Sequence, residues 1–198
     1  MVASTWQHAE VARDLLVPRG AIAADRTQRE LALVAAHLSV VWRLLRRLGL
    51  SPEDADDATQ EVFVIAVGKL DRIEPEKERS FLYGIAVRLA SRHHRSSNLR
   101  ESRTVRGLDV DQYRSRELSA DELIDRKDGL AFLDQILAEM TPDLRTTFAL
   151  YELEEMTMAE IAALTETPMG TVASRLRRAR EHFQEAVKRL QTQRARPR

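Results

Sequence analysis

The carboxyl-terminal third of the chain contains a cluster of side chains that donate hydrogen bonds, within a segment that is also rich in arginine. Hydroxyl and guanidinium groups of this kind bind phosphate oxygens, and arginine also matches the O6 and N7 acceptors of guanine. The pattern predicts contact with nucleic acid; the alternative is an arginine-rich surface helix that binds no partner. The donors of this cluster are Thr171, Ser174, Arg175, Arg177 and Arg178.

A second basic segment lies near the middle of the chain, where Arg88, Arg92 and Arg95 recur at helical spacing. His93 and His94 stand between them, and we expect them to be surface donors near nucleic acid. Adjacent residues point about 100° apart on a helix, so these histidines cannot hold one metal ion from one face. The sequence shows no glycine-rich phosphate loop and no nucleophile with its base, so we expect no metal, no cofactor and no enzymatic activity.

The formal net charge of the 198 residues is zero, but the charges alternate in blocks along the chain. Residues 51–78 are acidic and residues 79–106 are basic, and residues 134–170 are again acidic and residues 171–198 basic. Two successive acidic-then-basic blocks predict two modules, each with one basic face that meets a polyanion. The other interpretation is ordinary solvated helices, with acids at their starts and bases at their ends.

The composition favours an all-α fold. The chain holds 7 glycines, 6 prolines and no cysteine, while 31% of its residues are charged. Few helix breakers and many helix formers argue against a β-sandwich or barrel, and the lack of cysteine excludes disulfides and cysteine metal sites in this chain. No apolar run reaches the length of a membrane span and no signal-peptide pattern is present, so we expect a cytoplasmic protein.

Apolar spacing predicts three helices in the first module. The first runs over residues 30–48 and buries a stripe that includes Leu31 and Leu38. Ser51 is the expected cap of the second helix, with proline at its first position. The third helix is expected over residues 80–95, with Phe81, Leu82, Ile85 and Leu89 facing inward.

The second module is predicted to contain four helices over residues 128–190. Thr157 and Glu160 have the spacing of a capping box at the start of a short helix. Thr167 and Pro168 then begin a long basic helix. A short capped helix, a tight turn and a basic helix outline a helix-turn-helix, whose second helix enters the major groove of DNA.

Three segments, in this order along the chain, resemble parts of the extracytoplasmic-function (ECF) sigma factors, the small bacterial subunits that direct RNA polymerase to promoters. Residues 54–63 resemble the polymerase-binding helix of that family. Residues 81–86, with Arg95 nearby, resemble the next helix, which reads the upstream edge of the melted promoter. Residues 168–180 resemble the recognition helix. The resemblance implies two helical domains joined by a flexible linker, the second containing the helix-turn-helix.

The resemblance also implies which residues bind the partners, which are core RNA polymerase and promoter DNA. Asp57, Gln60 and Glu61 would contact a coiled coil of the largest polymerase subunits, with charge mainly steering the encounter. The alternative is that the acids of this segment only stabilise a helix amino terminus. Residues 71–80 would capture an unstacked base. Because the family commonly has an anti-sigma factor, such a protein is a further candidate partner. The implied DNA contacts are Arg88, Arg92 and Arg95 with the minus-ten element, and Thr171, Ser174, Arg175, Arg177 and Arg178 with the minus-thirty-five element.

The chain departs from the family pattern at two places that affect local structure. Gly84 stands where the family usually has arginine, and glycine costs about 1 kcal/mol inside a helix. Glu166 stands where the family usually has the glycine of the turn. A left-handed conformation at such a residue costs roughly 1–2 kcal/mol, so we expect a looser turn before the recognition helix.

The sequence therefore predicts a sigma factor that recognises minus-ten and minus-thirty-five elements. A non-sigma helix-turn-helix regulator is the main alternative, but it would need only the second module and would leave Asp57, Gln60 and Glu61 without a role. A helical hydrolase that uses paired acids with His93 or His94 is a third possibility without a recognisable catalytic set. The predicted divisions are an amino-terminal extension (1–29), a polymerase and minus-ten domain (30–95), a linker (96–127) and a helix-turn-helix domain (128–198).

Overall fold

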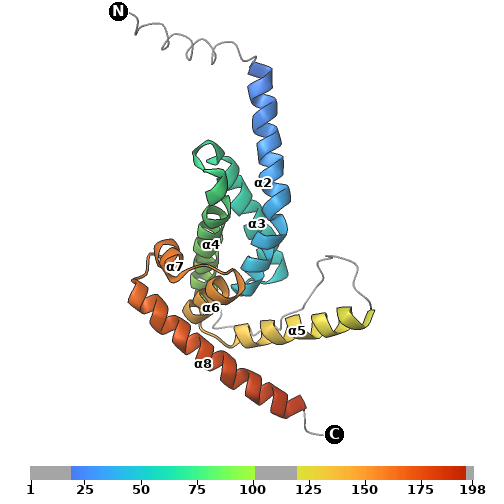
Figure 1. Cartoon of the computed structure of the whole chain (residues 1–198), viewed down its shortest axis with the longest axis vertical. Helices are drawn as coiled ribbons and strands as arrows, with labels where there is room; N and C mark the ends of the chain where they lie inside the picture. Colours follow the sequence, from blue (N-terminus) through green and yellow to red (C-terminus); the bar gives the residue numbers. More distant parts are fainter. Residues whose placement is uncertain (1–18, 101–119, 195–198) are drawn as a thin grey trace, which may run out of the picture. The chain divides into compact units, whose positions relative to one another are not determined.

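The structure is a computed structural model that describes residues 19–100 and 120–194, so the predicted linker lies mostly outside the described residues (Figure 1). The regular elements in these two ranges are all helical, which confirms the all-α prediction. None of the described helices is long and apolar enough to cross a membrane. The chain forms two compact units, Met1–His37 and Leu38–Arg198, whose boundary lies inside the first described helix.

Helix α2 (Arg19–Arg47) begins well before the predicted start at residue 30. Leu33, Val41, Leu44 and Leu45 are its buried large apolar residues, and Leu48, just after its end, is buried as well. Leu31 and Leu38, which were predicted to face inward, are 66% and 40% exposed. The helical spacing of the apolar residues was therefore correct, but spacing alone does not show how far along a helix its neighbours extend.

Helix α3 (Pro52–Val67) begins as predicted, because the Ser51 hydroxyl accepts a 3.1 Å hydrogen bond from the backbone N–H of Asp54. Two 3₁₀ turns, η1 (Leu70–Arg72) and η2 (Pro75–Lys77), fill the polar stretch that follows. Helix α4 (Glu78–Arg100) then packs against α3, and it extends beyond the predicted range of 80–95 at both ends. We call residues 38–100 the amino module.

The carboxyl module comprises residues 120–194. It contains α5 (Ala120–Ala138), α6 (Pro142–Phe148), the π-helical turn η3 (Ala149–Leu153), α7 (Met158–Thr165) and α8 (Met169–Arg194). Its core includes Ile136 of α5 and the rings of Phe148 and Phe183, which stack with their centroids 5.0 Å apart. This core holds α6 against α8, and α7 packs on α8 as the first helix of the helix-turn-helix.

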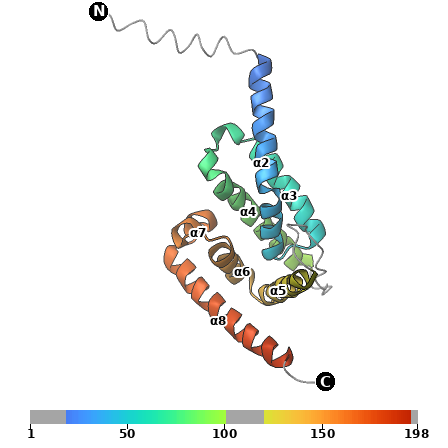
Figure 2. The same cartoon turned by 45° about the vertical axis from the view of Figure 1, so that its right-hand side comes forward.

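Within the second compact unit, the amino and carboxyl modules contact each other directly. Helices α6 and α7 pack against α4, on a side of α4 that α3 does not cover (Figures 1 and 2). As a result Tyr83, Ala86 and Val87 of α4 are buried, in addition to the predicted Leu82, Ile85 and Leu89. Phe81, also predicted to face inward, is only half-buried.

Candidate functional site

Helix α8, the predicted recognition helix, is preceded by a turn that is closed by backbone hydrogen bonds. Thr157 and Glu160 form the predicted capping box at the start of α7. Glu166 ends α7 in the left-handed conformation, with φ of 51°, and the backbone N–H of Thr167 donates to the Ala162 carbonyl at 3.0 Å. The expectation of a looser turn was therefore wrong, because the surrounding structure imposes the left-handed geometry on a glutamate.

The predicted minus-thirty-five residues lie on the amino-terminal half of α8, but their side chains differ in exposure and in the partners that hold them. Thr171 and Arg178 are exposed, and Arg178 has no ion-pair partner among the described residues. Arg177 is exposed and pairs with Glu181 at 2.8 Å. Arg175 is half-buried and donates to Asp143 of α6, and the Ser174 hydroxyl donates to the backbone oxygen of its own helix at Thr171.

The predicted polymerase-binding residues lie along the outer side of α3. Asp57 and Gln60 are exposed, and Val64 continues their row with 73% of its surface exposed. An isolated exposed valine gives no recognisable signal in a sequence, which is why the sequence did not single it out. Glu61 differs from its neighbours, because its two carboxylate oxygens lie 2.7 and 2.8 Å from the Arg92 guanidinium.

The Glu61–Arg92 pair joins two sets of residues that the sequence assigned to different partners. It lies over a groove of about 240 Å³ between α3 and α4, whose lining also includes Asp54, Asp57 and His93. Arg88 and Arg95, the other two predicted minus-ten residues, are exposed. The outer face of the amino module is therefore one surface with acids on α3 and arginines on α4.

The two histidines of α4 are engaged within the protein and do not serve as free surface donors. His93 Nε2 lies 3.1 Å from a carboxylate oxygen of Asp54, and His94 Nε2 lies 2.7 Å from the Leu48 carbonyl oxygen. Burial acts to raise the pKa of Asp54, but the hydrogen bonds from Ser51 and the charge of His93 outweigh it and hold that pKa below its usual value. Within the described ranges, no three acidic or histidine side chains are arranged to hold a metal ion.

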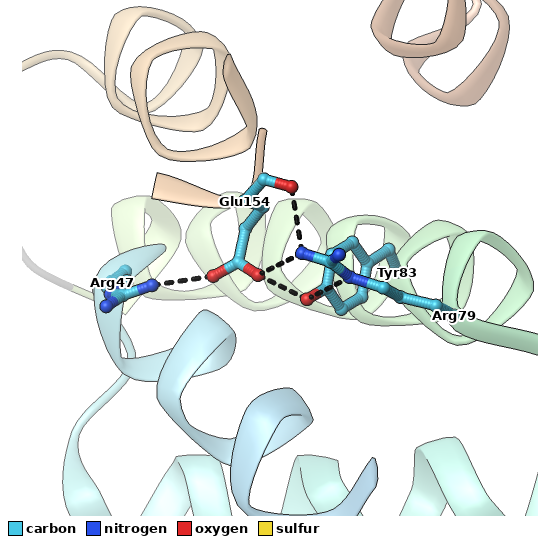
Figure 3. Close-up of polar contacts among 4 residues, drawn as sticks. All are labelled: Arg47, Arg79, Tyr83 and Glu154. Atoms are coloured by element: carbon cyan, nitrogen blue, oxygen red, sulfur yellow. Dashed lines mark hydrogen bonds and ion pairs between the residues drawn. The ribbon is translucent and has the colours of Figure 1, made fainter. Parts of the chain in front are cut away.

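Glu154 is a polar residue that the sequence analysis did not single out. It follows the π-helical turn η3, is only 4% exposed, and reaches into the amino module (Figure 3). Its carboxylate accepts from Arg47 Nη1 at 2.6 Å, from Arg79 Nη2 at 3.2 Å and from the hydroxyl of Tyr83. Arg79 also donates to the Glu154 backbone oxygen at 2.8 Å and to the Tyr83 hydroxyl at 3.0 Å.

Each of these four residues is hydrogen-bonded to at least one of the others. Burial raises the pKa of Tyr83, and its hydrogen bond to Glu154 raises it further, so the phenol remains a donor. Two guanidinium groups oppose the one carboxylate, which satisfies the requirement that a buried charge be paired. The sequence signal for this contact was weak, because Glu154 is far along the chain from Arg47 and from the Arg79–Tyr83 pair, and none of the four belongs to a local motif.

Comparison with known proteins gives matches in both modules. Residues 33–100 match the family Sigma-70 region 2, and residues 133–183 match Sigma-70, region 4. The chain is 30% identical to the ECF RNA polymerase sigma factor SigC of Mycobacterium tuberculosis, over 76% of this chain and 78% of that protein. It is 31% identical to the ECF RNA polymerase sigma-E factor of Escherichia coli, over 69% of this chain and 75% of that protein.

Two solved structures share the fold. The sigma factor RpoE of Bartonella quintana, in complex with the anti-sigma factor NepR, superposes with a TM-score of 0.62 at 19% identity, over 78% of this chain and 94% of that one. CnrH, in complex with the cytosolic domain of CnrY, superposes with a TM-score of 0.56 at 22% identity, over 82% of this chain and 94% of that one.

Proposed function

Because the chain belongs to the ECF sigma factors, which bind core RNA polymerase and direct transcription initiation at specific promoters, we propose that the outer side of α3 is its polymerase-binding surface. The observation that supports this most directly is the exposed row of Asp57, Gln60 and Val64 on α3. The opposite side of α3 buries Ala55, Val62 and Phe63, so the exposed row has no structural role in the core.

We propose that the arginines of α4 and α8 contact the two promoter elements. Arg88 and Arg95 are exposed and suit the phosphates and bases of a melted minus-ten strand. Arg92 connects this surface to the proposed polymerase-binding surface, because its guanidinium donates a hydrogen bond to the Glu61 carboxylate on α3. At the minus-thirty-five element, the free guanidinium of Arg178 suits a phosphate, while the bond from Arg175 to Asp143 fixes Arg175 in one direction. Thr171, Ser174 and Arg177 complete the proposed surface of α8.

Three further properties belong to the proposal. The family acts as a non-catalytic initiation factor, and we infer that this chain has no catalytic activity of its own and acts in the cytoplasm. Both similar solved structures are complexes with another protein, and in one of them a sigma factor is bound to a protein named as an anti-sigma factor, which supports an anti-sigma factor as a partner of this chain as well. A non-sigma regulator is no longer needed as an alternative, since it leaves the region 2 match at residues 33–100 unexplained.

The polymerase-binding surface can be tested by the double substitution Asp57→Ala with Gln60→Ala. We expect weaker binding to core polymerase in a titration, without loss of helicity, because exposed polar sites change stability by about 0.5 kcal/mol or less. Glu61 is left unchanged because its substitution would also release Arg92.

The matched control is Glu53→Ala, which removes another exposed acid from the first turn of the same helix. If the double variant and the control both keep full affinity for core polymerase while remaining helical, the proposed surface is wrong.

A further inference from the structure

The Glu61–Arg92 ion pair connects the surface that we propose for polymerase with the surface that we propose for the minus-ten strand. Glu61 lies on the same outer side of α3 as Asp57, because residues four apart share one side of a helix. Arg92 lies on α4 between Arg88 and Arg95, which are four residues before it and three after it. The acidic row of α3 and the arginine row of α4 therefore meet at this pair.

The pair engages the whole Glu61 carboxylate, although both side chains remain in contact with solvent. Arg92 Nη2 lies 2.7 Å from one carboxylate oxygen of Glu61 and 2.8 Å from the other. The Arg92 side chain is 63% exposed and the Glu61 side chain is 43% exposed. Because ion pairs with this exposure contribute little to stability, the pair can open when another cation competes for the carboxylate.

The packing of α3 on α4 does not depend on this pair. The two helices pack against each other, and both contribute buried apolar side chains to the core, among them Val62 of α3 and Leu89 of α4. Glu61 is more than one turn from either end of α3, so its carboxylate caps neither end. The structure therefore requires nothing of Glu61 that would explain why an arginine holds it.

Asp54, another acid of α3 that pairs with α4, does have such a structural role. It lies 3.1 Å from His93 Nε2, but it also accepts a hydrogen bond from the Ser51 hydroxyl at the start of α3. Asp57 has no hydrogen-bond or ion-pair partner among the described residues. Of the three acids that line the groove between α3 and α4, one serves the helix cap, one is open, and Glu61 is held by arginine alone.

A partner that binds the outer side of α3 has to displace Arg92 from Glu61. Because this side of α3 is acidic, the partner surface that complements it is basic. A cation that approaches Glu61 finds both carboxylate oxygens engaged and is repelled by the like charge of Arg92. Binding of a basic partner therefore exchanges the internal ion pair for an external one.

We propose that Arg92 competes with core polymerase for Glu61, so that the chain binds polymerase less tightly than its acidic surface would allow. The inference rests on the proposed polymerase-binding surface of α3. When polymerase takes Glu61, the Arg92 guanidinium becomes available between Arg88 and Arg95 in the proposed minus-ten surface. Because coupling between two binding events is reciprocal, a DNA strand that binds Arg92 makes Glu61 more available to polymerase.

The test is a titration of core polymerase with the full chain carrying Arg92→Ala. We expect this variant to bind about two- to fivefold more tightly than the unsubstituted chain, which is the range that exposed ion pairs contribute. If the pair only held α3 on α4, its loss would leave the affinity unchanged or lower it. Arg92 is exposed, so the variant should remain folded, and circular dichroism checks its helicity.

Two comparisons separate competition from a general effect of charge. Lys69→Ala is the matched control, because it removes an exposed cation from the same module without releasing Glu61, and it should leave the affinity unchanged. The second comparison places Arg92→Ala in a chain that already carries Glu61→Gln. Here Arg92→Ala should give no gain in affinity, because no carboxylate remains to be released.

The proposal is overturned if Arg92→Ala binds core polymerase no more tightly than the unsubstituted chain. It is also overturned if the gain is equal in the presence of Glu61→Gln, or if Lys69→Ala produces the same gain. A failure of the proposed polymerase-binding surface gives a different result, because Asp57→Ala with Gln60→Ala then keeps full affinity in the same titration. If that double variant loses affinity while Arg92→Ala gains none, the surface is correct and only the competition is wrong.

Discussion

Helices α4 and α8 both present arginines for a nucleic-acid partner, but they are embedded in different ways. Helix α4 is covered by α3 on one side and by the carboxyl module on another. Of the nine positions from Leu82 to Ala90, all except Arg88 are buried. Helix α8 buries a single stripe that includes Val172, Leu176 and Ala179. Under the proposed assignment of DNA contacts, α4 therefore combines structural and binding roles on most of its surface, whereas α8 keeps them on opposite sides.

The strongest test of this comparison concerns the buried part of α4. Leu82 is 1% exposed, and Leu82→Ala should lower the free energy of unfolding by about 2–5 kcal/mol, through lost burial and the cavity left behind. The measurement is denaturant unfolding followed by circular dichroism. Arg178→Ala on the exposed side of α8 is the control and should change stability by about 0.5 kcal/mol or less; equal effects of the two substitutions would contradict the difference between the helices.

A smaller effect is expected at the turn that leads into α8. Glu166 adopts the left-handed conformation, so Glu166→Gly should raise the stability of the protein by roughly 1 kcal/mol, because glycine adopts this conformation without strain. The increase is measured as a higher midpoint of thermal unfolding. Gly84→Ala is the opposite exchange, at a glycine inside α4. The added Cβ would meet only the Arg88 side chain, at ordinary contact distance, so packing does not oppose the removal of this glycine from the helix. A loss of stability in Glu166→Gly would show that the glutamate side chain makes a compensating contribution.

The stability that the amino-terminal cap of α3 provides should decrease in acid. The pKa of Asp54 is lower in the folded protein than in the unfolded chain. At a pH near the ordinary pKa of a carboxyl group, the folded state therefore binds fewer protons than the unfolded state. The stabilisation from Asp54 is therefore complete above about pH 4 and is lost as the pH falls through the lowered value. Ser51→Ala should cost about 1 kcal/mol at neutral pH, through loss of the cap and of the hydrogen bond that the Ser51 hydroxyl donates to the Asp54 carboxylate.

This cost should become smaller near pH 3, and unfolding curves of Ser51→Ala and the unsubstituted protein at the two pH values provide the measurement. A difference that stays constant between neutral pH and pH 3 would mean that the charge of Asp54 takes no part in capping α3.

The smallest expected effect concerns DNA binding by α8. Arg178→Ala should weaken binding to a minus-thirty-five duplex a few-fold, evenly across sequence variants, and reduce the salt slope by about one unit, as expected for a single phosphate contact. Arg175→Ala is the comparison, because Arg175 is held by Asp143. A base contact by Arg175 predicts a loss of preference at one promoter position, and a phosphate contact predicts an even loss of affinity like that of Arg178→Ala. Titrations of the full-length chain with promoter variants at several salt concentrations separate the two roles. Unchanged affinity and salt slope in both variants would exclude α8 as the helix that reads DNA.

Local features of the fold could be predicted from the sequence because each depends on neighbouring residues. The Ser51 cap and the Thr157–Glu160 capping box are each set within one helical turn, and the structure confirms both. The family assignment was likewise predictable, since it rests on three contiguous segments, and the matches over residues 33–100 and 133–183 confirm it.

Features that depend on contact between distant elements could not be predicted. Burial of Tyr83 requires the carboxyl module, so helical spacing within α4 placed only the side facing α3. The Glu61–Arg92 and His93–Asp54 pairs likewise form across two helices, and residue types alone suggested separate partners for them. The assignment of individual residues to polymerase or to DNA remains a prediction, which the variants above test.

The winding of one helical turn has a consequence for how related chains are compared. In η3 the backbone N–H of Glu154 donates to the Ala149 carbonyl, five residues back, at 3.1 Å. Such a π turn holds one residue more than an α-helical turn. Five residues in this turn therefore cover about the same rotation as four residues of a regular α-helix. A relative with one residue fewer between 149 and 153 can wind this turn as regular α-helix and keep the following residue on nearly the same side of the axis. An alignment that asks which relatives share the contact of Glu154 with Arg47 and Tyr83 should therefore allow a gap of one residue inside this turn.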